Sequence, residues 1–445
     1  MNRRLFIGKT TATTAGMALG LYGIHCSASA PVKPALLGGP RSFEGAWLSW
    51  PVYDHTEESE LTAVLHSKKW GRLGGEKTAK FEAEHSEMYG AKHTLAVTSG
   101  TAALYTMLGA LDIGPGDEII IPPYTFIATY NVVTLNYALP VFADSDIESF
   151  QMDPSEIEKH INANTKAIIP VHIGGLPADL DRIGAIASKH NIPLLEDACQ
   201  AHLAEWKGKC VGNYGLAGAF SFQATKNLNS GEGGAVITND TAFYERCFSF
   251  HHQGQSANTA TIEPGTGIRG SNLRITEFQS ALLTAQMQRV TEQTNLRHTN
   301  ALYLNTMMQQ IAGITPAKIY SGVTKGAFHL YMFRYNKDQF KGLSREKFLK
   351  ALKAEGIPCS AGYGSLPDSS YIQSLADNKY YRRIYGETKM SEWLEQIKCP
   401  KNLQLTGEAV WLFQNMLLGS RQDMEKIAEA VDKIRKFAGD ISKYQ

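Results

Sequence analysis

The chain has 445 residues, which is long for a single hydrophobic core and indicates two domains. Its composition is that of a globular protein, with 43% hydrophobic residues and a formal net charge of +1. This balance argues against a general nucleic-acid binder, which would carry a strongly basic face.

The N-terminus has the order of features of a twin-arginine export signal. Arg3 and Arg4 precede a mildly apolar stretch over residues 10–24. This stretch is shorter than the roughly 20 residues that a membrane-spanning helix needs, so we predict no stable membrane span. We therefore predict a signal peptide over residues 1–30 and a periplasmic or otherwise exported protein. The alternative is a disordered basic N-terminus.

Small residues at 26–30 resemble a cleavage region. Pro31 disfavours cleavage directly before it, so an earlier cut is expected. Cys26 is a candidate for lipid anchoring, although His25 before it fits that role poorly.

Between residues 94 and 240, short apolar and β-branched runs alternate with amphipathic stretches. This alternation indicates βαβ units and a mostly parallel sheet. The last two runs are separated by only about a dozen Gly-rich residues, too few for a helical crossover, so the last strand is expected to be antiparallel. The predicted strands cover 94–98, 118–121, 139–143, 167–171, 193–196, 219–222 and 235–238, with helices over 101–111 and 180–190.

The fold class predicted from this pattern is α/β, with two domains after an extended N-terminal arm. The large domain has a mostly parallel, seven-stranded sheet flanked by helices, and the smaller C-terminal domain is α+β. A helix over 271–289 should lead out of the large domain. The predicted ranges are 31–60 for the arm, 61–290 for the large domain and 291–445 for the small domain, which includes helices 344–355 and 425–437 and a strand 328–335.

A lysine and an acid follow two of the predicted strands. Lys226 lies just beyond the strand 219–222, and Asp197 ends the strand 193–196. Ligands of parallel sheets bind beyond the carboxyl ends of the strands. There, a lysine amine could form a Schiff base with pyridoxal phosphate, and a carboxylate could keep the ring nitrogen protonated so that the ring acts as an electron sink. The alternative for Asp197 is a simple helix cap.

Other candidate cofactor ligands occupy the same edge. Residues 99–103 follow a strand and open a helix, whose bare amides can bind phosphate, although ordinary capping gives the same pattern. Ser221 could bind the same phosphate. Phe126 could stack on the cofactor ring, or it could be a core aromatic. No metal site is predicted, because the adjacent His251 and His252 have no partners at ligand spacing.

Together, these motifs resemble the DegT/DnrJ/EryC1/StrS aminotransferases, fold-type-I enzymes of the aspartate aminotransferase superfamily that use pyridoxal phosphate. The resemblance extends from about Trp70 to the C-terminus. It rests on the runs 99–104, 114–118, 196–202, 221–227, 231–234, 271–277 and 417–419.

The resemblance implies a role for each candidate residue. Lys226 would be the Schiff-base lysine and proton shuttle, and Asp197 would pair with the pyridine nitrogen. Gln200 would lie near the phenolic oxygen of the cofactor, and Phe126 on its ring face. Asn272 would reach the phosphate of the neighbouring subunit, which implies a homodimer with shared active sites. The remaining phosphate ligands would be Gly100, Thr101, Ala102 and Ser221.

The expected activity is transfer of an amino group from L-glutamate or L-glutamine to a keto sugar or keto cyclitol. Gln223 and the Trp- and Pro-rich arm favour the inosose and aminohydroxybenzoate branch of the family. Leu203 stands where the family often has Gly, a departure expected to reshape the pocket near Gln200. Dehydratase relatives carry His in place of Lys226. The alternatives are a pyridoxal-phosphate-dependent sugar dehydratase or eliminase, and a non-catalytic sensor or binding protein of the same fold.

Overall fold

The computed structural model of the chain describes residues 32–256 and 268–444. The predicted signal peptide, residues 1–30 with Cys26, lies outside these residues. In the described part of the chain, no helix is both long and apolar enough to cross a membrane. Nor do three His, Cys, Asp or Glu side chains of these residues gather as metal ligands would.

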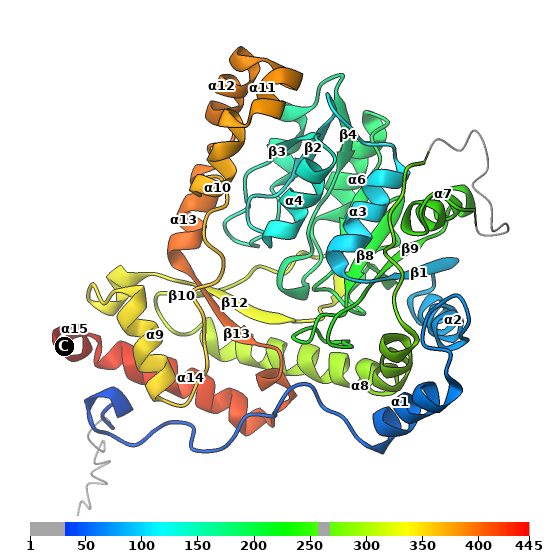
Figure 1. Cartoon of the computed structure of the whole chain (residues 1–445). Helices are drawn as coiled ribbons and strands as arrows, with labels where there is room; N and C mark the ends of the chain where they lie inside the picture. The colour runs from blue at the N-terminus through cyan, green and yellow to red at the C-terminus, as the bar shows by residue number, and fades with distance from the viewer. Residues whose placement is uncertain (1–31, 257–267, 445) are drawn as a thin grey trace, which may run out of the picture. The chain divides into compact units, whose positions relative to one another are not determined.

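A seven-stranded sheet forms the centre of the larger part of the structure (Figure 1). Its strand order is β1-β9-β8-β5-β4-β2-β3, and the segments that contain β4 and β5 are joined by two isolated parallel bridges, Ile168 to Leu194 and Val171 to Asp197. Only β9 is antiparallel to its neighbours, which confirms the direction expected for the last strand. The strands are β1 (His93–Val97), β2 (Glu118–Ile121), β3 (Leu139–Phe142), β4 (Thr165–Ile168), β5 (Leu195–Asp197), β8 (Ala217–Ser221) and β9 (Gly234–Thr238).

Helices cover both faces of this sheet, which explains why its strands read as continuous apolar runs. Along β2, Ile119 and Ile121 belong to the core formed with α3, α4 and α7. Ile120, which points the other way, belongs to the core formed with α2, α6 and α8. The helices are α1 (His55–Ser67), α2 (Lys77–Tyr89), α3 (Gly100–Ala110), α4 (Ile127–Leu135), α5 (Pro154–Ile157), α6 (Leu180–Lys189), α7 (Thr241–His251) and α8 (Glu277–Met308).

Helix α8 begins later and runs further than the predicted range 271–289. Thr276 and Gln279 form a capping box, in which each side chain accepts a hydrogen bond from the backbone of the other. The residues before this cap are extended instead, and Asn272 bridges to His252. The capping box therefore leaves Asn272 on an extended segment rather than on a helix.

A second, antiparallel sheet of β10, β12 and β13 packs with α9 and α14 around its own core. Helices α10–α12, by contrast, return to the large sheet (Figure 1): Tyr381 Oη donates to Ala138 O at 2.9 Å and Trp393 Nε1 to Pro140 O at 2.7 Å. The domain boundary at residue 290 stays a prediction. The elements are β10 (Ile314–Pro316), β12 (Leu330–Tyr335), β13 (Ala409–Phe413), α9 (Arg345–Ala354), α10 (Ser370–Gln373), α11 (Lys379–Tyr385), α12 (Glu387–Gln396), α13 (Pro400–Glu408), α14 (Arg421–Lys436) and α15 (Ala438–Lys443), with a small sheet of β6 (Glu205–Trp206), β7 (Lys209–Cys210) and β11 (Val323–Lys325).

The N-terminal arm is held by a buried carboxylate. The Glu355 side chain accepts hydrogen bonds from the Ala35 amide at 2.7 Å and the Ser42 amide at 2.8 Å. Lys433 Nζ lies 2.8 Å from the same carboxylate and neutralises it. This anchor holds the start of the arm, which continues without regular structure from Gly39 to the first residue of α1.

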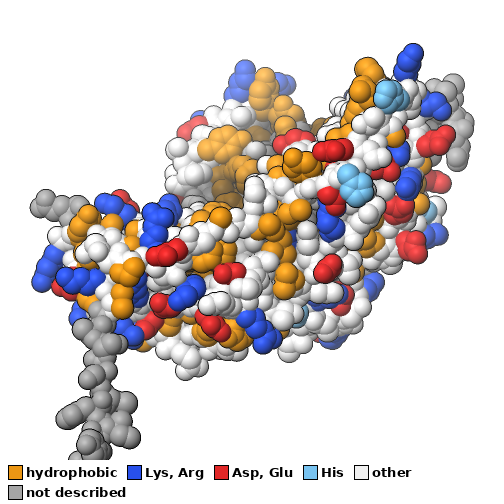
Figure 2. Space-filling model, turned by 90° about the horizontal axis from the view of Figure 1, so that it is seen from below, with side chains coloured by type: hydrophobic (Ala, Val, Ile, Leu, Met, Phe, Trp, Pro, Cys, Tyr) orange, Lys and Arg blue, Asp and Glu red, His pale blue; other side chains and the backbone are white. Residues whose placement is uncertain are grey.

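Charged side chains of both signs are interspersed with apolar ones on the face shown in Figure 2. Lys, Arg, Asp and Glu alternate over this face rather than separating into fields of one sign. The distribution agrees with the balanced formal charge of +1.

Candidate active site

The carboxyl ends of the parallel strands open into a cavity of about 1130 Å³. Its lining includes residues that directly follow β1, β2, β5 and β8, as expected at this edge of a parallel sheet. The arm and the residues around β13 close the opposite side. Seven predicted residues meet here: Gly100, Thr101, Phe126, Asp197, Gln200, Ser221 and Lys226.

The N-terminus of α3 and the end of β8 approach each other closely. A Cβ atom on Gly100 would lie only 2.6 Å from Ser221 Cβ and 2.8 Å from Cys199 Sγ, so no larger residue fits. Gly234, on β9, is equally constrained by the Ser99 carbonyl. The first amides of α3 thus face the cavity beside the Ser221 hydroxyl, and they form a cradle suited to an anion.

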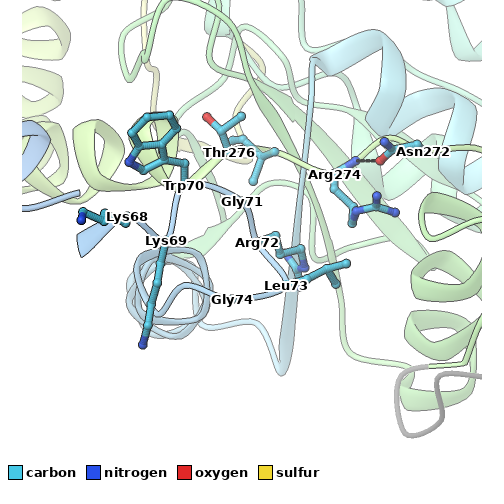
Figure 3. A pocket seen from close by; sticks show the side chains of 11 residues that line it. Lys68, Lys69, Trp70, Gly71, Arg72, Leu73, Gly74, Asn272, Arg274 and Thr276 are labelled. Atoms are coloured by element: carbon cyan, nitrogen blue, oxygen red, sulfur yellow. Dashed lines mark hydrogen bonds between the residues drawn. The ribbon is translucent and has the colours of Figure 1, made fainter. Parts of the chain in front are cut away.

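Two predicted residues lie outside the cavity lining. Ala102 is buried in α3, and its amide donates to Ser99 Oγ at 3.0 Å. Asn272 lines a separate pocket of about 480 Å³ together with Arg72 and Arg274 (Figure 3). There, Asn272 Oδ1 accepts the Arg274 amide at 3.4 Å. In this chain, Asn272 therefore makes no contribution to the walls of the cavity.

Asp197 is a buried carboxylate held by neutral donors. Thr129 Oγ1 donates to Oδ2 at 2.9 Å, and the Cys199 amide donates to Oδ1 at 3.2 Å. Thr129 is in turn 2.9 Å from Thr125 Oγ1. No Lys or Arg among the described residues forms an ion pair with Asp197, although the group is only 5% exposed. A cationic ring nitrogen would supply the missing counter-charge.

Lys226 is half-buried in the loop that follows β8. Its backbone is fixed on both sides, because its amide donates to Gln223 O at 2.8 Å and its carbonyl accepts Trp50 Nε1 at 3.2 Å. Burial lowers the pKa of the Lys226 amine, and the nearby Asp197 carboxylate opposes that shift. A larger fraction of this amine is therefore uncharged near neutral pH than in an exposed lysine.

Phe126 and Gln200 occupy opposite kinds of environment. Phe126 is 56% exposed, unusual for a large aromatic residue, and it lines the cavity as a free ring face. Gln200 is buried and fixed, since its Oε1 accepts the Gly174 amide at 2.7 Å and its Nε2 donates to Tyr363 Oη at 3.0 Å. The arrangement suits a flat ring stacked on Phe126 with its edge near Gln200.

His202 supports the site from behind β8. Its Nε2 donates to Ser221 O at 2.8 Å, and its Nδ1 accepts from Tyr89 Oη at 3.1 Å. Burial lowers the pKa of His202 to about 3, so the ring is neutral and can play both hydrogen-bonding roles. This contact fixes the backbone just before the Lys226 loop.

The sequence did not reveal several wall residues. His329, Tyr363 and Trp411 reach the cavity from positions far along the chain. His329 Nδ1 lies 3.3 Å from Asn227 Oδ1, directly after the lysine. A single His before a strand, or a Trp within one, carries no local signal, and only the tertiary fold brings them here.

Leu203 does not line the cavity, which corrects the expectation that it reshapes the pocket near Gln200. Its side chain is buried in the core on the other side of the sheet. Its φ angle is +59°, in the left-handed region that glycine adopts freely. Leucine there costs roughly 1–2 kcal/mol, and the effect is on the backbone rather than on the pocket.

Residues 51–409 match the model of the DegT/DnrJ/EryC1/StrS aminotransferase family. The match covers most of the chain and confirms the resemblance seen in the motifs. A 3-amino-5-hydroxybenzoate synthase of Amycolatopsis mediterranei is 32% identical over 388 residues, which are 86% of this chain and 96% of that protein. An L-glutamine:2-deoxy-scyllo-inosose aminotransferase of Streptoalloteichus tenebrarius is 32% identical over 424 residues, 92% of this chain and 99% of that one.

Solved structures share the fold over most of this chain. The crystal structure of a 3-amino-5-hydroxybenzoic acid synthase has a TM-score of 0.78 and 31% identity, and the match covers 88% of this chain and 99% of that chain. An aminotransferase from Psychrobacter cryohalolentis has a TM-score of 0.75 and 29% identity, covering 89% and 100%. The prediction of an α/β fold, that of the fold-type-I pyridoxal-phosphate enzymes, is thus confirmed.

The pKa of Lys226 gives a first prediction. In protein stripped of cofactor, the amine should titrate below the ordinary lysine value of 10.5, because burial disfavours its charge. Asp197→Asn should lower this pKa further, since it removes the carboxylate that favours the charged amine. NMR of reductively ¹³C-methylated protein measures both values, with the signal assigned from Lys226→Arg. A value at or above 10.5, or a rise in Asp197→Asn, would contradict the prediction.

Proposed function

The chain belongs to the DegT/DnrJ/EryC1/StrS aminotransferase family, and from this premise we propose that it moves an amino group from L-glutamine or L-glutamate to a keto cyclitol or keto sugar. The observation that carries the proposal is the meeting of Lys226, Asp197 and the α3 cradle in one cavity. The names of two relatives, an inosose aminotransferase and an aminohydroxybenzoate synthase, support cyclic acceptors.

The residues present fit pyridoxal phosphate. The phosphate would bind at the α3 N-terminus, where Gly100, whose close contact with Ser221 excludes a Cβ, lines the cavity together with Thr101 and Ser221. The buried Asp197 carboxylate has the charge that a protonated ring nitrogen requires. The exposed face of Phe126 offers a stacking surface. When bound, the cofactor would serve as the electron sink for carbanion chemistry.

The chain's own groups would then share the work of the reaction. Lys226 Nζ would take the proton from the α-carbon of the donor in the first half-reaction. In the second half-reaction it would deliver a proton to the carbon that receives the amino group, and its lowered pKa favours both transfers. Thr129 and the Cys199 amide would keep Asp197 oriented toward the ring nitrogen. Gln200, held at both ends, would keep a fixed amide dipole at the edge of the ring.

The cavity wall favours a compact polyol as acceptor. Six aromatic side chains line it, and rings of this kind stack on the C–H faces of sugars and cyclitols. Tyr363 and Trp411, for example, lie edge to face with centroids 4.6 Å apart. Among the described lining residues of this chain, Lys226 is the only Lys or Arg, which suits an uncharged acceptor better than a diphosphate. The aromatic residues are Trp47, Trp50, Phe126, Tyr363, Trp411 and Phe413.

We further propose a homodimer in which Asn272 completes the site of the neighbouring subunit. Lys68, Lys69 and Arg274 line the pocket of Asn272, whereas Arg72 is paired with Glu82, so the surroundings are cationic and suited to an anion. The exposed Trp70 and Leu73 flank it, at 52% and 70% exposure, and a second copy would cover them. A twofold contact would complete two sites at once.

Export is proposed from the sequence of the N-terminus. Arg3 and Arg4 belong to a signal of the pathway that moves folded proteins. A pyridoxal-phosphate enzyme needs a cofactor made in the cytoplasm, so export after folding and cofactor loading is the consistent route. The acceptor would then be an extracytoplasmic keto sugar or cyclitol.

Substitution of the two central residues tests the activity. Lys226→Ala should abolish turnover with inosose acceptors. It should also abolish the borohydride-reducible link between cofactor and protein. Asp197→Ala should slow turnover by roughly a thousandfold or more, because electrostatic stabilisation of the transition state is usually the largest catalytic contribution. Lys207→Ala, at an exposed lysine, is the control. Normal turnover in Lys226→Ala, or a loss below about tenfold (about 1.4 kcal/mol) in Asp197→Ala, would refute these roles.

Subunit complementation tests the shared site. Lys226→Ala and Asn272→Ala should each be inactive as pure proteins. Mixed and refolded together, they should recover about a quarter of wild-type activity, since half of the dimers are mixed and each has one intact site of two. Sedimentation of the mixture establishes the dimer. Absence of recovery, or a fully active monomer on dilution, would exclude a site shared between subunits.

Cell fractionation tests export. Arg3→Lys combined with Arg4→Lys should trap a cofactor-loaded precursor in the cytoplasm, because the twin-arginine pathway requires the pair. The wild-type chain should be processed and recovered outside the cytoplasm. An unchanged periplasmic yield in the double variant, or wild-type protein found uncut and only in the cytosol, would disprove export by this route.

A further inference from the structure

Helix α8 buries a guanidinium beside the cavity. Arg297 is 0% exposed, and its Nε donates to Gln414 Oε1 at 2.9 Å. Its terminal nitrogens, Nη1 and Nη2, have no hydrogen-bond partner among the described residues. Burying a guanidinium whose two terminal nitrogens lack hydrogen bonds is costly, so this arrangement calls for a functional explanation.

Arg297 lies directly behind the cavity wall, on the side of the lysine. Its Cζ is 5.0 Å from the centre of the Trp50 ring, and both Trp50 and Gln414 line the cavity. The Trp50 indole donates in turn to the carbonyl of Lys226 at 3.2 Å. His329, also in the wall, is close enough to both cations that each contributes to its lowered pKa, after burial as the main cause.

We propose that Arg297 binds the α-carboxylate of the amino-acid donor once Trp50 or Gln414 moves aside. This assignment rests on the proposed aminotransferase function. A guanidinium presents parallel N–H groups that match a carboxylate, and the two free nitrogens of Arg297 are the pair that such a contact uses.

The chemistry of the two substrates favours the donor over the acceptor. Both must use the same cavity in turn, but only the amino acid is certain to carry a carboxylate. Lys226, the only Lys or Arg among the described lining residues, is committed to the reaction itself. Trp50 and Gln414 would cover the Arg297 guanidinium while a neutral polyol is bound. They would expose it when an anionic substrate binds.

The covering groups are an irregular segment of the arm and one side chain. Residues 47–51 have no helical or strand structure. Their hydrogen bonds to the rest of the wall include Trp50 to the Lys226 carbonyl and Asn415 Nδ2 to Leu48 O at 2.7 Å. The Gln414 side chain is held to Arg297 Nε by one hydrogen bond, at 2.9 Å. The exposure of Arg297 thus requires local movement rather than opening of the fold.

The test compares each donor with its α-carboxamide, in which the carboxylate is neutralised. Single turnovers of the full-length holoenzyme are followed through the cofactor absorbance. Wild-type enzyme should prefer the carboxylate. Arg297→Met should lose this preference, with kcat/KM for the carboxylate donor falling roughly 10- to 150-fold, the range for a hydrogen bond to a charged group, and kcat/KM for the carboxamide unchanged. Arg297→Lys should recover part of the preference, because it keeps the charge without the fork.

The second half-reaction separates the donor from the acceptor. Transfer from the aminated enzyme to a keto-inosose should be unchanged in Arg297→Met. A loss confined to this step, with donor preference intact, would place Arg297 on a carboxylate of the acceptor and overturn the proposal.

Stability distinguishes binding from a structural role. Arg297→Met should be at least as stable to heat as the wild type, because an apolar side chain of similar length removes an unpaired buried charge. Arg289→Met is the matched control, since Arg289 lies on the same helix but pairs with Asp54 at 2.9 Å. If Arg297→Met lost stability and slowed both forms of the donor equally, Arg297 would be structural and the proposal would be wrong.

A binding measurement keeps the inference separate from the proposed activity. (S)-2-hydroxyglutarate carries the carboxylates of the donor but no amine, and calorimetry should detect its binding to wild-type holoenzyme and not to Arg297→Met. That result would support the site even if neither amino acid were a substrate, in which case the proposed function alone would fail. Equal binding to both proteins would overturn the role of Arg297.

Discussion

A carboxylate buried without a cation is the constraint on which the rest of this site depends. Asp197 is held by a threonine hydroxyl and a backbone amide, both neutral donors. Burying such a group without a cationic partner is unfavourable, and a cationic ligand beside it would compensate that cost. Because Asp197 ends β5 next to β8, the same strand edge brings Lys226 within electrostatic reach. In the proposed function, the acid would define where the cofactor binds, and the sheet would define where the lysine meets it.

The arm shows how distant contacts shape the cavity. Glu355 and Lys433, both buried, tie the first residues of the arm to the helices around the second sheet. Trp47 Nε1 adds a bond to Gly356 O at 2.8 Å, and the chain then passes along the cavity to Trp50. The arm is thus anchored at its start by Glu355, whereas its backbone near Trp50 has no regular structure. That combination suits a wall that must accept two different substrates in turn.

The sequence predicts those parts of the molecule whose causes are local. Continuous apolar runs predict the strands of the buried sheet, and the short Gly-rich gap correctly predicts one antiparallel strand. The edge of the sheet then brings Asp197, Ser221 and Lys226 together. Local signals fail where long-range packing determines a residue's position. His329 reaches the lysine loop only through the tertiary fold. The return of helices α10–α12 to the large sheet likewise depends on long-range hydrogen bonds, such as that of Trp393 to Pro140. The expectation for Leu203 was wrong for another reason: this residue does not line the cavity, and its positive φ angle affects the backbone instead.

The protonation states around the lysine follow from the same burial. Burial lowers the pKa of His202 to about 3 and that of His329 well below its usual range. A histidine whose pKa is lowered stays neutral at every pH above that value, so neither ring titrates near neutrality. Both then act as fixed hydrogen-bonding groups, and they leave the positive charge near the cofactor to Lys226 and Arg297. Burial opposes the charge of the Lys226 amine and the neighbouring Asp197 carboxylate favours it, while burial lowers the pKa of Arg297 to about 9.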